Sequence, residues 1–194
     1  MIDVHSHIIP NVDDGARSVE ETFNILKEAK VVGFTDVILT SHFLLNYYET
    51  DAQELIFWKD KLQEVLDQRG PNIKLHSGME IYISNQMEEL MQKNKLLTLA
   101  NSRYMLIELP LASNVQYLDY VIYYLEAKGI KTIIAHPERY KCVQKDPSIV
   151  EEYIEKGCLM QCNYGSIVNL YGNEAEKTIK TLLKKNQVHF LGSD

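Results

Sequence analysis

The chain of 194 residues lacks the short motifs that mark several large enzyme classes. It has no Gly-x-x-x-x-Gly-Lys-Ser/Thr loop, no Gly-x-Gly-x-x-Gly fingerprint and no Gly-x-Ser-x-Gly elbow. These absences argue against a P-loop NTPase, a dinucleotide-binding enzyme and a serine hydrolase of the α/β type. None of the three cysteines is followed six residues later by arginine, which excludes a cysteine-nucleophile phosphatase loop.

Long apolar runs, cysteines and positive charge are also scarce. No apolar run approaches the roughly 20 residues of a membrane-spanning helix, and residues 1–10 carry two histidines and an aspartate, unlike a signal peptide. Three cysteines are few for a disulfide-stabilised secreted domain, so we expect a cytoplasmic protein without membrane insertion. The net charge of −7 argues against nucleic acid as a partner.

What the chain does contain is a regular alternation of short β-branched runs with helical patterns. Its length predicts one domain over residues 1–194. Strand–helix repetition predicts parallel strands joined by right-handed crossovers, and therefore an α/β fold, either a barrel or an open doubly wound sheet. The expected strands are 2–6, 35–41, 73–83, 104–109, 131–136, 158–164 and 188–193, and the expected helices are 18–32, 51–68, 85–95, 115–128, 147–156 and 174–186.

Residues that can bind metals fall in the expected strands, mostly at their carboxyl ends, where parallel α/β folds place their chemistry. His5 and His7 end the first strand with Cα atoms about 6.6 Å apart, so both imidazoles lie on one face. Imidazole and carboxylate together suit Zn²⁺, Mn²⁺ or Fe²⁺. So many ligands predict more than one metal, with Glu80 as a bridging carboxylate. The other members of the set are His42, Glu108, His136 and Asp194.

Three assignments have competing explanations. Glu108 lies inside an apolar run, where an unpaired buried carboxylate is costly, and a metal is the simplest cation to pair with it. Asp14 lies in an Asp-Asp-Gly sequence, which is equally typical of a turn. Arg139 lies one loop step beyond a candidate ligand and suits phosphate because its guanidinium binds oxygens as a fork. A surface salt bridge explains Arg139 equally well.

Taken together, the motifs resemble those of the PHP-domain (polymerase and histidinol phosphatase) metallophosphoesterases, in particular the bacterial tyrosine-protein phosphatases of capsule and exopolysaccharide operons. The resemblance implies a distorted (β/α)7 barrel. The family pattern continues Ser-Asp-x-His, whereas this sequence stops at Asp194, so we expect a domain that is C-terminally truncated relative to the family and lacks its last helix. The segments that carry the resemblance are 1–7, 12–15, 40–42, 78–82, 106–109, 135–140 and 192–194.

The resemblance also implies a centre of two to three divalent metals, with manganese expected first and iron, zinc or magnesium as alternatives. Carried over by position, the ligands form three sets: His5, His7, Glu80 and Asp194; Glu80, Glu108 and His136; Asp14 and His42. Arg139 is implied to bind the substrate phosphate as the catalytic arginine.

The implied reaction is hydrolysis of a protein phosphotyrosine by a metal-activated hydroxide. The implied substrate is a partner tyrosine autokinase in the regulation of capsule or exopolysaccharide synthesis. Two alternatives stay open. One is a small-molecule phosphoesterase such as a histidinol-phosphate phosphatase, and the other is a catalytically impaired metal-binding module.

Overall fold

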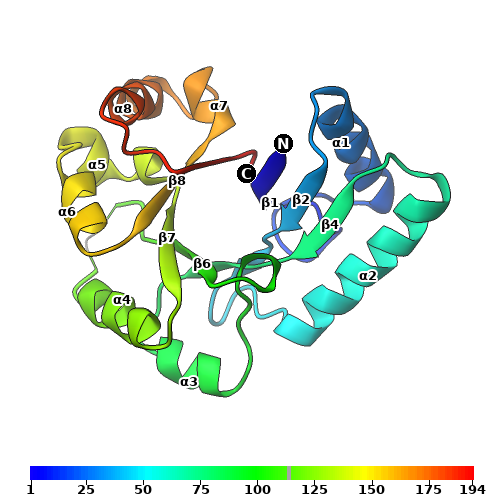
Figure 1. Cartoon of the computed structure of the whole chain (residues 1–194), viewed down its shortest axis with the longest axis horizontal. Coiled ribbons are helices and arrows are strands. Elements are labelled where there is room, and N and C mark those ends of the chain that lie inside the picture. Colours follow the sequence, from blue (N-terminus) through cyan, green and yellow to red (C-terminus); the bar gives the residue numbers. More distant parts are fainter. Residues whose placement is uncertain (113–114) are drawn as a thin grey trace.

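The computed structural model describes residues 1–112 and 115–194, and it places helices around the outside of a curled sheet (Figure 1). Every strand-to-strand ladder in this part of the chain is parallel, which confirms the predicted α/β class. The strands are β1 (Ile2–Ser6), β2 (Asp36–Leu39), β3 (His42–Phe43), β4 (Lys74–Ser77), β5 (Glu80–Tyr82), β6 (Tyr104–Glu108), β7 (Lys131–Ala135), β8 (Leu159–Asn163) and β9 (Phe190–Gly192).

The helices follow the predicted positions, with two short additions. At the start of the first helix, the Ser18 side chain accepts a hydrogen bond from the Glu21 N–H at 3.1 Å, as an N-cap residue does. The short helices α5 and α7 were not predicted, because so few residues show no helical period. The helices are α1 (Val19–Val31), α2 (Ala52–Arg69), α3 (Met87–Gln92), α4 (Leu118–Ala127), α5 (Lys141–Lys145), α6 (Ile149–Glu155), α7 (Tyr164–Ile167) and α8 (Asn173–Lys184).

The sheet is parallel and curled, as in part of a barrel, but it has two parts and not the seven strands of the distorted (β/α)7 barrel that the resemblance implies. One part has the order β1-β2-β4 and the other the order β3-β5-β6-β7-β8-β9. The expected strand 73–83 is broken into β4 and β5, which belong to different parts. The two ends of the curl meet where the Asp194 N–H donates to the His5 carbonyl at 2.8 Å. The chain therefore forms a curled parallel sheet whose strand ends converge.

Apolar side chains pack on both faces of this sheet. The larger cluster lies between the strands and the helices and includes the fully buried Leu26 of α1 and Ile179 of α8. A smaller cluster on the other face includes Leu106 of β6. Since side chains alternate along a strand, the face of β6 that buries Leu106 also presents Glu108 at the strand's carboxyl end.

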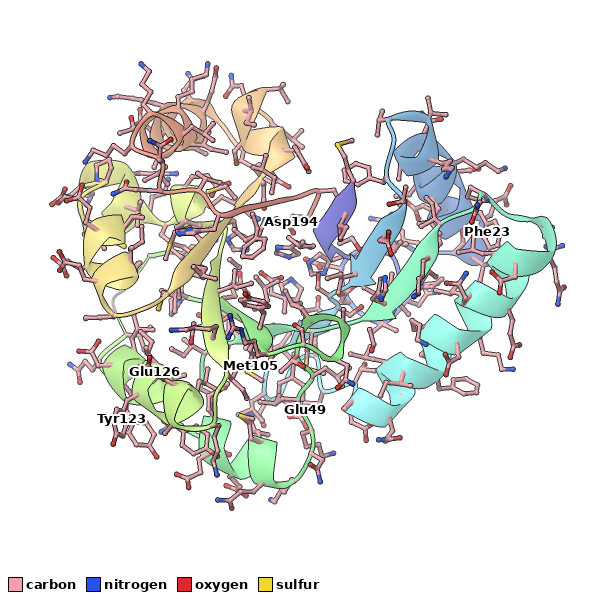
Figure 2. The ribbon with its side chains drawn as sticks, viewed as in Figure 1. Phe23, Glu49, Met105, Tyr123, Glu126 and Asp194 are labelled. Carbon is pink, nitrogen blue, oxygen red and sulfur yellow. The ribbon has the colours of Figure 1, made fainter. Side chains whose placement is uncertain are left out.

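The outer and inner surfaces differ in character (Figure 2). Tyr123 and Glu126 of α4 lie exposed at the outside of the molecule, whereas Asp194 lies at its centre. Among the described residues, no helix combines the length and the apolar character needed to cross a bilayer. The candidate metal ligands lie at the centre of the molecule, where the strands end.

Candidate metal centre

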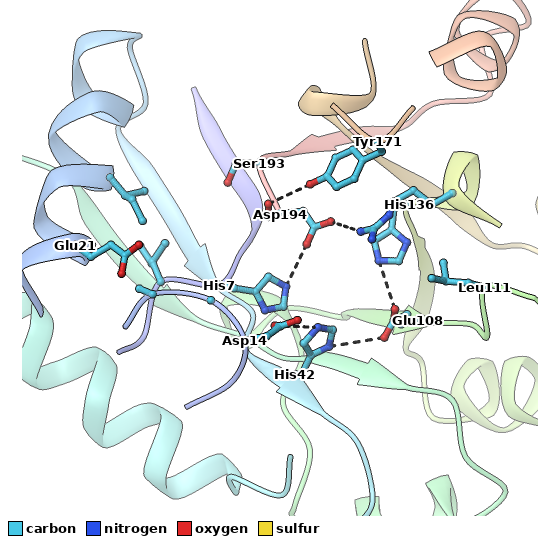
Figure 3. Close-up of a pocket in the computed structure, with 15 residues that line it drawn as sticks. His7, Asp14, Glu21, His42, Glu108, Leu111, His136, Tyr171, Ser193 and Asp194 are labelled. Carbon is cyan, nitrogen blue, oxygen red and sulfur yellow. Dashed lines mark hydrogen bonds and ion pairs between the residues drawn. The ribbon is translucent and has the colours of Figure 1, made fainter. Parts of the chain in front are cut away.

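The carboxyl ends of the strands surround a cavity of about 550 Å³ (Figure 3). Six of the eight predicted metal ligands line this cavity, and the remaining two, His5 and Glu80, are fully buried directly beneath it. The structure thus brings together side chains that lie up to 189 positions apart in the sequence, from His5 to Asp194. The six that line the cavity are His7, Asp14, His42, Glu108, His136 and Asp194.

The group with the most members consists of His5, His7, Glu80 and Asp194, whose donor atoms all lie within 4.8 Å of one another. The Nε2 atoms of both histidines lie 3.1 Å from Glu80 Oε2. The same two atoms lie 3.5 and 3.4 Å from Asp194 Oδ1. These four residues are the first ligand set implied by the sequence motifs, and their assignment as ligands stays a prediction.

His42 connects two further groups that could hold a metal ion. One contains His7, Asp14 and His42, and the other contains His42, Glu80 and Glu108. His42 Nε2 lies 3.6 Å from Asp14 Oδ1, and His42 Nδ1 lies 3.2 Å from Glu80 Oε2. The second implied set has another histidine, His136, beside the same two glutamates. Its Nε2 lies 2.9 Å from Glu80 Oε1 and 3.7 Å from Glu108 Oε1.

The environment of Glu80 fits a divalent cation. Its Oε2 is fully buried and finds no hydrogen-bond donor within the described ranges, 1–112 and 115–194. Three imidazole nitrogens, from His5, His7 and His42, nevertheless approach this oxygen to 3.1–3.2 Å. A buried carboxylate oxygen without a partner is costly, and a metal ion bound by these nitrogens and oxygens would satisfy all of them.

Two residues orient the first pair of histidines. Asp13 Oδ2 lies 2.8 Å from His7 Nδ1, and Gln161 Oε1 lies 2.7 Å from His5 Nδ1. The Gln161 amide nitrogen donates to two oxygens of β8, so its carbonyl oxygen must face the histidine as an acceptor. His5 therefore carries its proton on Nδ1 and directs the Nε2 lone pair to the cluster. This arrangement is typical of histidines that bind metals.

Arg139 and Tyr171 stand together at one side of the cavity. The Arg139 guanidinium lies 4.4 Å from the centre of the Tyr171 ring, and its Nη1 donates to Asp194 Oδ2 at 2.8 Å. The arginine does form an ion pair, as one interpretation of the sequence held. Its partner, however, is a candidate ligand inside the cavity, and Arg139 itself lines that cavity. Its assignment as the phosphate-binding residue stays a prediction.

Sequence reasoning did not single out Asp13, Gln161 or Tyr171. Asp13 could have been found, because it shares its turn with Asp14, and its Oδ2 also accepts the His42 backbone N–H at 2.9 Å. Gln161 lies inside an apolar strand and Tyr171 follows a helix too short to predict. Neither residue carries a signal that marks it before the fold is known.

Burial and neighbouring charges shift the pKa values of the side chains in the cluster. Burial and the neighbouring Glu80 carboxylate raise the pKa of Glu108 to about 7. Burial alone would raise the pKa of Glu80, but the histidines around it, His5 first, hold that pKa well below its usual range. Burial opposes charge on His5 and His7 too, yet their carboxylate partners raise both pKa values. A cation that binds here must therefore displace protons.

The chain is similar to known proteins over its whole length. The family profile described as capsular polysaccharide synthesis, CpsB/CapC, matches residues 1–194. The tyrosine-protein phosphatase YwqE of Bacillus subtilis is 31% identical over 194 residues, which cover 100% of this chain and 76% of YwqE. The tyrosine-protein phosphatase CpsB of Streptococcus pneumoniae is 30% identical over 199 residues, with coverages of 100% and 82%.

A solved structure from work on YwqE and CpsB, described there as unique metal-dependent tyrosine phosphatases, superposes with a TM-score of 0.95 at 31% identity. The match covers 100% of this chain and 78% of the solved one. Whole-chain agreement in sequence and in structure confirms the resemblance that the motifs indicated. The chain belongs to the CpsB/CapC family of capsular polysaccharide synthesis.

Proposed function

We propose that this protein is a metal-dependent phosphatase that hydrolyses phosphotyrosine in proteins. The observation that carries the proposal is the convergence of imidazoles and carboxylates around Glu80, beside Arg139, in one open cavity. The similarity to YwqE and CpsB, which are named tyrosine-protein phosphatases, supports the choice of phosphotyrosine over other phosphoesters. Residues 1–194 then form one phosphatase domain.

The eight candidate ligands would hold two to three divalent ions. We expect manganese, in line with the family resemblance, with iron, zinc or magnesium as alternatives. Mixed imidazole and carboxylate donors suit manganese, iron and zinc. When bound, such ions polarise phosphoryl oxygens and lower the pKa of water. The ligand sets are His5, His7, Glu80 and Asp194; Glu80, Glu108 and His136; Asp14 and His42.

Arg139 would bind the substrate phosphate. Its guanidinium lines the cavity with one side against the Tyr171 ring, so its orientation is fixed before a phosphate arrives. A held guanidinium offers a fork of donors to two phosphoryl oxygens, whose charge must be stabilised in the transition state. Tyr171 and Asp194 both contact Arg139 and would act as its positioning residues.

A cysteine nucleophile plays no part in the proposed reaction. None of the three cysteines lines the cavity, and burial raises the pKa of the Cys158 thiol to about 12 and that of Cys162 well above its usual range. Only a thiolate is an effective nucleophile. Direct attack of water on phosphorus, without a phosphocysteine intermediate, is the course that these residues support.

We place the reaction in the cytoplasm, on a tyrosine autokinase that takes part in capsule or exopolysaccharide synthesis. All three cysteines are free, which is typical of a reducing compartment. The matched family is described by capsular polysaccharide synthesis, which supports this setting for the substrate. The net charge of −7 gives no support to a nucleic acid partner.

The test is phosphate release from a phosphotyrosyl peptide, measured with added Mn²⁺ and with EDTA, beside the same assay on histidinol phosphate. We expect release from the peptide that depends on the metal and exceeds release from histidinol phosphate. A preference for histidinol phosphate would instead show a small-molecule phosphatase. Bound metal without any turnover would show a metal-binding module.

A further inference from the structure

His42 lacks the kind of partner that orients the two histidines of β1. His5 and His7 each turn one ring nitrogen to a residue outside the ligand set, Gln161 and Asp13 respectively. Within residues 1–112 and 115–194, the ring nitrogens of His42 face only carboxylates of the candidate ligands. Its side chain is also 17% exposed, against 0% for His5 and 7% for His7. Something other than a hydrogen bond must therefore hold this ring.

The ring of Tyr48 packs against His42. The two ring centres lie 5.8 Å apart with 15° between the planes, which is an offset stack. The His7 ring also approaches, at 4.5 Å and 41°, but His7 is itself a candidate ligand. The last torsion of a histidine side chain has a broad energy profile, so the imidazole turns readily unless a neighbour fixes its plane. Tyr48 is placed to be that neighbour.

A closed turn after β3 fixes the position of Tyr48. Leu44 and Tyr48 exchange backbone hydrogen bonds, with each N–H donating to the carbonyl of the other at 2.8 Å. Asn46, at the tip of the turn, has a φ of 64°, a left-handed conformation that asparagine adopts more readily than most residues. The Asn46 N–H donates to Glu49 Oε1 at 2.6 Å. The ring that stacks on His42 is thus held by the turn and not by the metal centre.

The ligand pair formed by Asp14 and His42 depends most on such support. His42 Nε2 lies 3.6 Å from Asp14 Oδ1, and the Asp14 side chain is 67% exposed, so neither side chain is confined by burial as His5 and Glu80 are. On the basis of the proposed phosphatase function, we propose that Tyr48 is a positioning residue that holds the His42 imidazole in the plane needed to bind a metal ion together with Asp14.

The experiment compares Tyr48→Leu, Tyr48→Phe and the control Tyr123→Leu. Leucine removes the aromatic face but keeps an apolar side chain, whereas phenylalanine keeps the stacking ring. Tyr123 lies on α4 and is 73% exposed, and neither Tyr48 nor Tyr123 lines the cavity. Each metal-free protein is titrated with Mn²⁺ in a calorimeter, and its Tm is measured in EDTA. Phosphate release from a phosphotyrosyl peptide is then followed at increasing Mn²⁺ concentration.

We expect Tyr48→Leu to bind its weakest Mn²⁺ ion about tenfold less tightly, the lower end of the effect of removing a residue that orients a metal ligand. Tyr48→Phe should stay within about twofold of the unmodified protein, because the stack is retained. Tyr123→Leu should match the unmodified protein. Since Asp14 and His42 are still present in Tyr48→Leu, turnover lost at low Mn²⁺ should return at about tenfold higher Mn²⁺.

The possible failures can be told apart. If the unmodified protein binds no Mn²⁺ and releases no phosphate, the proposed function is wrong, and the role of Tyr48 is wrong with it. If the unmodified protein does both and Tyr48→Leu equals Tyr123→Leu, only the role of Tyr48 is wrong. An equal loss of metal affinity in Tyr48→Phe would overturn that role, because the stacking ring would not be the cause. A large fall in the Tm of Tyr48→Leu in EDTA would also overturn it, because it would show damage to the fold.

Discussion

The hydroxyl of Tyr140 joins the end of β6, which carries Glu108, to the end of β7, which is followed by His136, so Tyr140→Phe should weaken the fold and the site together. The side chain is only 1% exposed. Its hydroxyl donates to the Ala135 carbonyl at 2.6 Å and accepts the Leu109 N–H at 2.9 Å. Each of these backbone groups belongs to the residue next to a candidate metal ligand. A single oxygen thus spans the ends of β6 and β7.

Phenylalanine fills the same space but leaves the Leu109 N–H buried without an acceptor and removes a donor from the Ala135 carbonyl. A buried polar group left unpaired costs about 1–3 kcal/mol, and a carbonyl that can still accept a second bond lies at the low end. The free energy of unfolding should therefore fall by roughly 2–4 kcal/mol. For a chain of this length the corresponding drop in Tm is about 4–16 °C.

Thermal unfolding in EDTA measures this effect without a contribution from bound metal. Tyr153→Phe is the matched control, because Tyr153 is also buried but has no hydroxyl hydrogen bond to another described residue. Its Tm should move by less than about 2 °C. Calorimetric titration should also show weaker Mn²⁺ binding for Tyr140→Phe. Equal Tm values for the two variants would refute the proposed role of the hydroxyl.

Three further predictions concern the metal centre and the phosphate. His136→Asn should lower both bound manganese and turnover. The protein should stay folded, because asparagine tolerates the left-handed backbone at this residue (φ 30°). The control is His76→Asn, which lies outside the cavity and should keep normal metal content and turnover. Full metal content with normal turnover in His136→Asn would remove it from the ligand set. Arg139→Ala should weaken inhibition by inorganic phosphate at least about tenfold with little loss of bound metal, and unaltered inhibition would exclude it as the phosphate-binding residue. The carboxylates that raise the pKa values of His5 and His7 favour protons on both rings. Mn²⁺ affinity should therefore fall as the pH falls, by at least about tenfold from pH 8 to pH 6 in calorimetric titrations. A pH-independent affinity would contradict the assignment of these histidines as ligands.

Much of the fold could be predicted because helix ends and the apolar runs of strands are properties of short segments. Ser18 caps α1 through a bond that spans three residues, and Asp51 caps α2 in the same way. The break of the expected strand 73–83 could not be predicted. An apolar run shows that a strand is buried but not which neighbour it pairs with, and here the two halves of one run join different parts of the sheet.

The same distinction applies to the site. Strand ends could be located from the sequence, and in a parallel fold all of them point to one edge, so seven of the eight candidate ligands, all except Asp14, could be expected together. The residues that orient these side chains could not be predicted. Gln161 contacts His5 across 156 positions of sequence, and Tyr171 contacts Arg139 only because of the course that a loop takes. Such contacts exist only after the elements have packed.

Asp14 shows that the turn and the ligand are not alternative explanations of one sequence. A Cβ atom on Gly15 would lie 2.0 Å from the His7 carbonyl oxygen, so the turn can approach this strand only because a glycine follows the aspartates. Gly192 does the same beside His5, where a Cβ atom would lie 2.5 Å from the histidine Cβ. In both places the close approach brings an aspartate to the cluster. The turn chemistry of Asp-Asp-Gly is therefore the means by which Asp14 reaches the site.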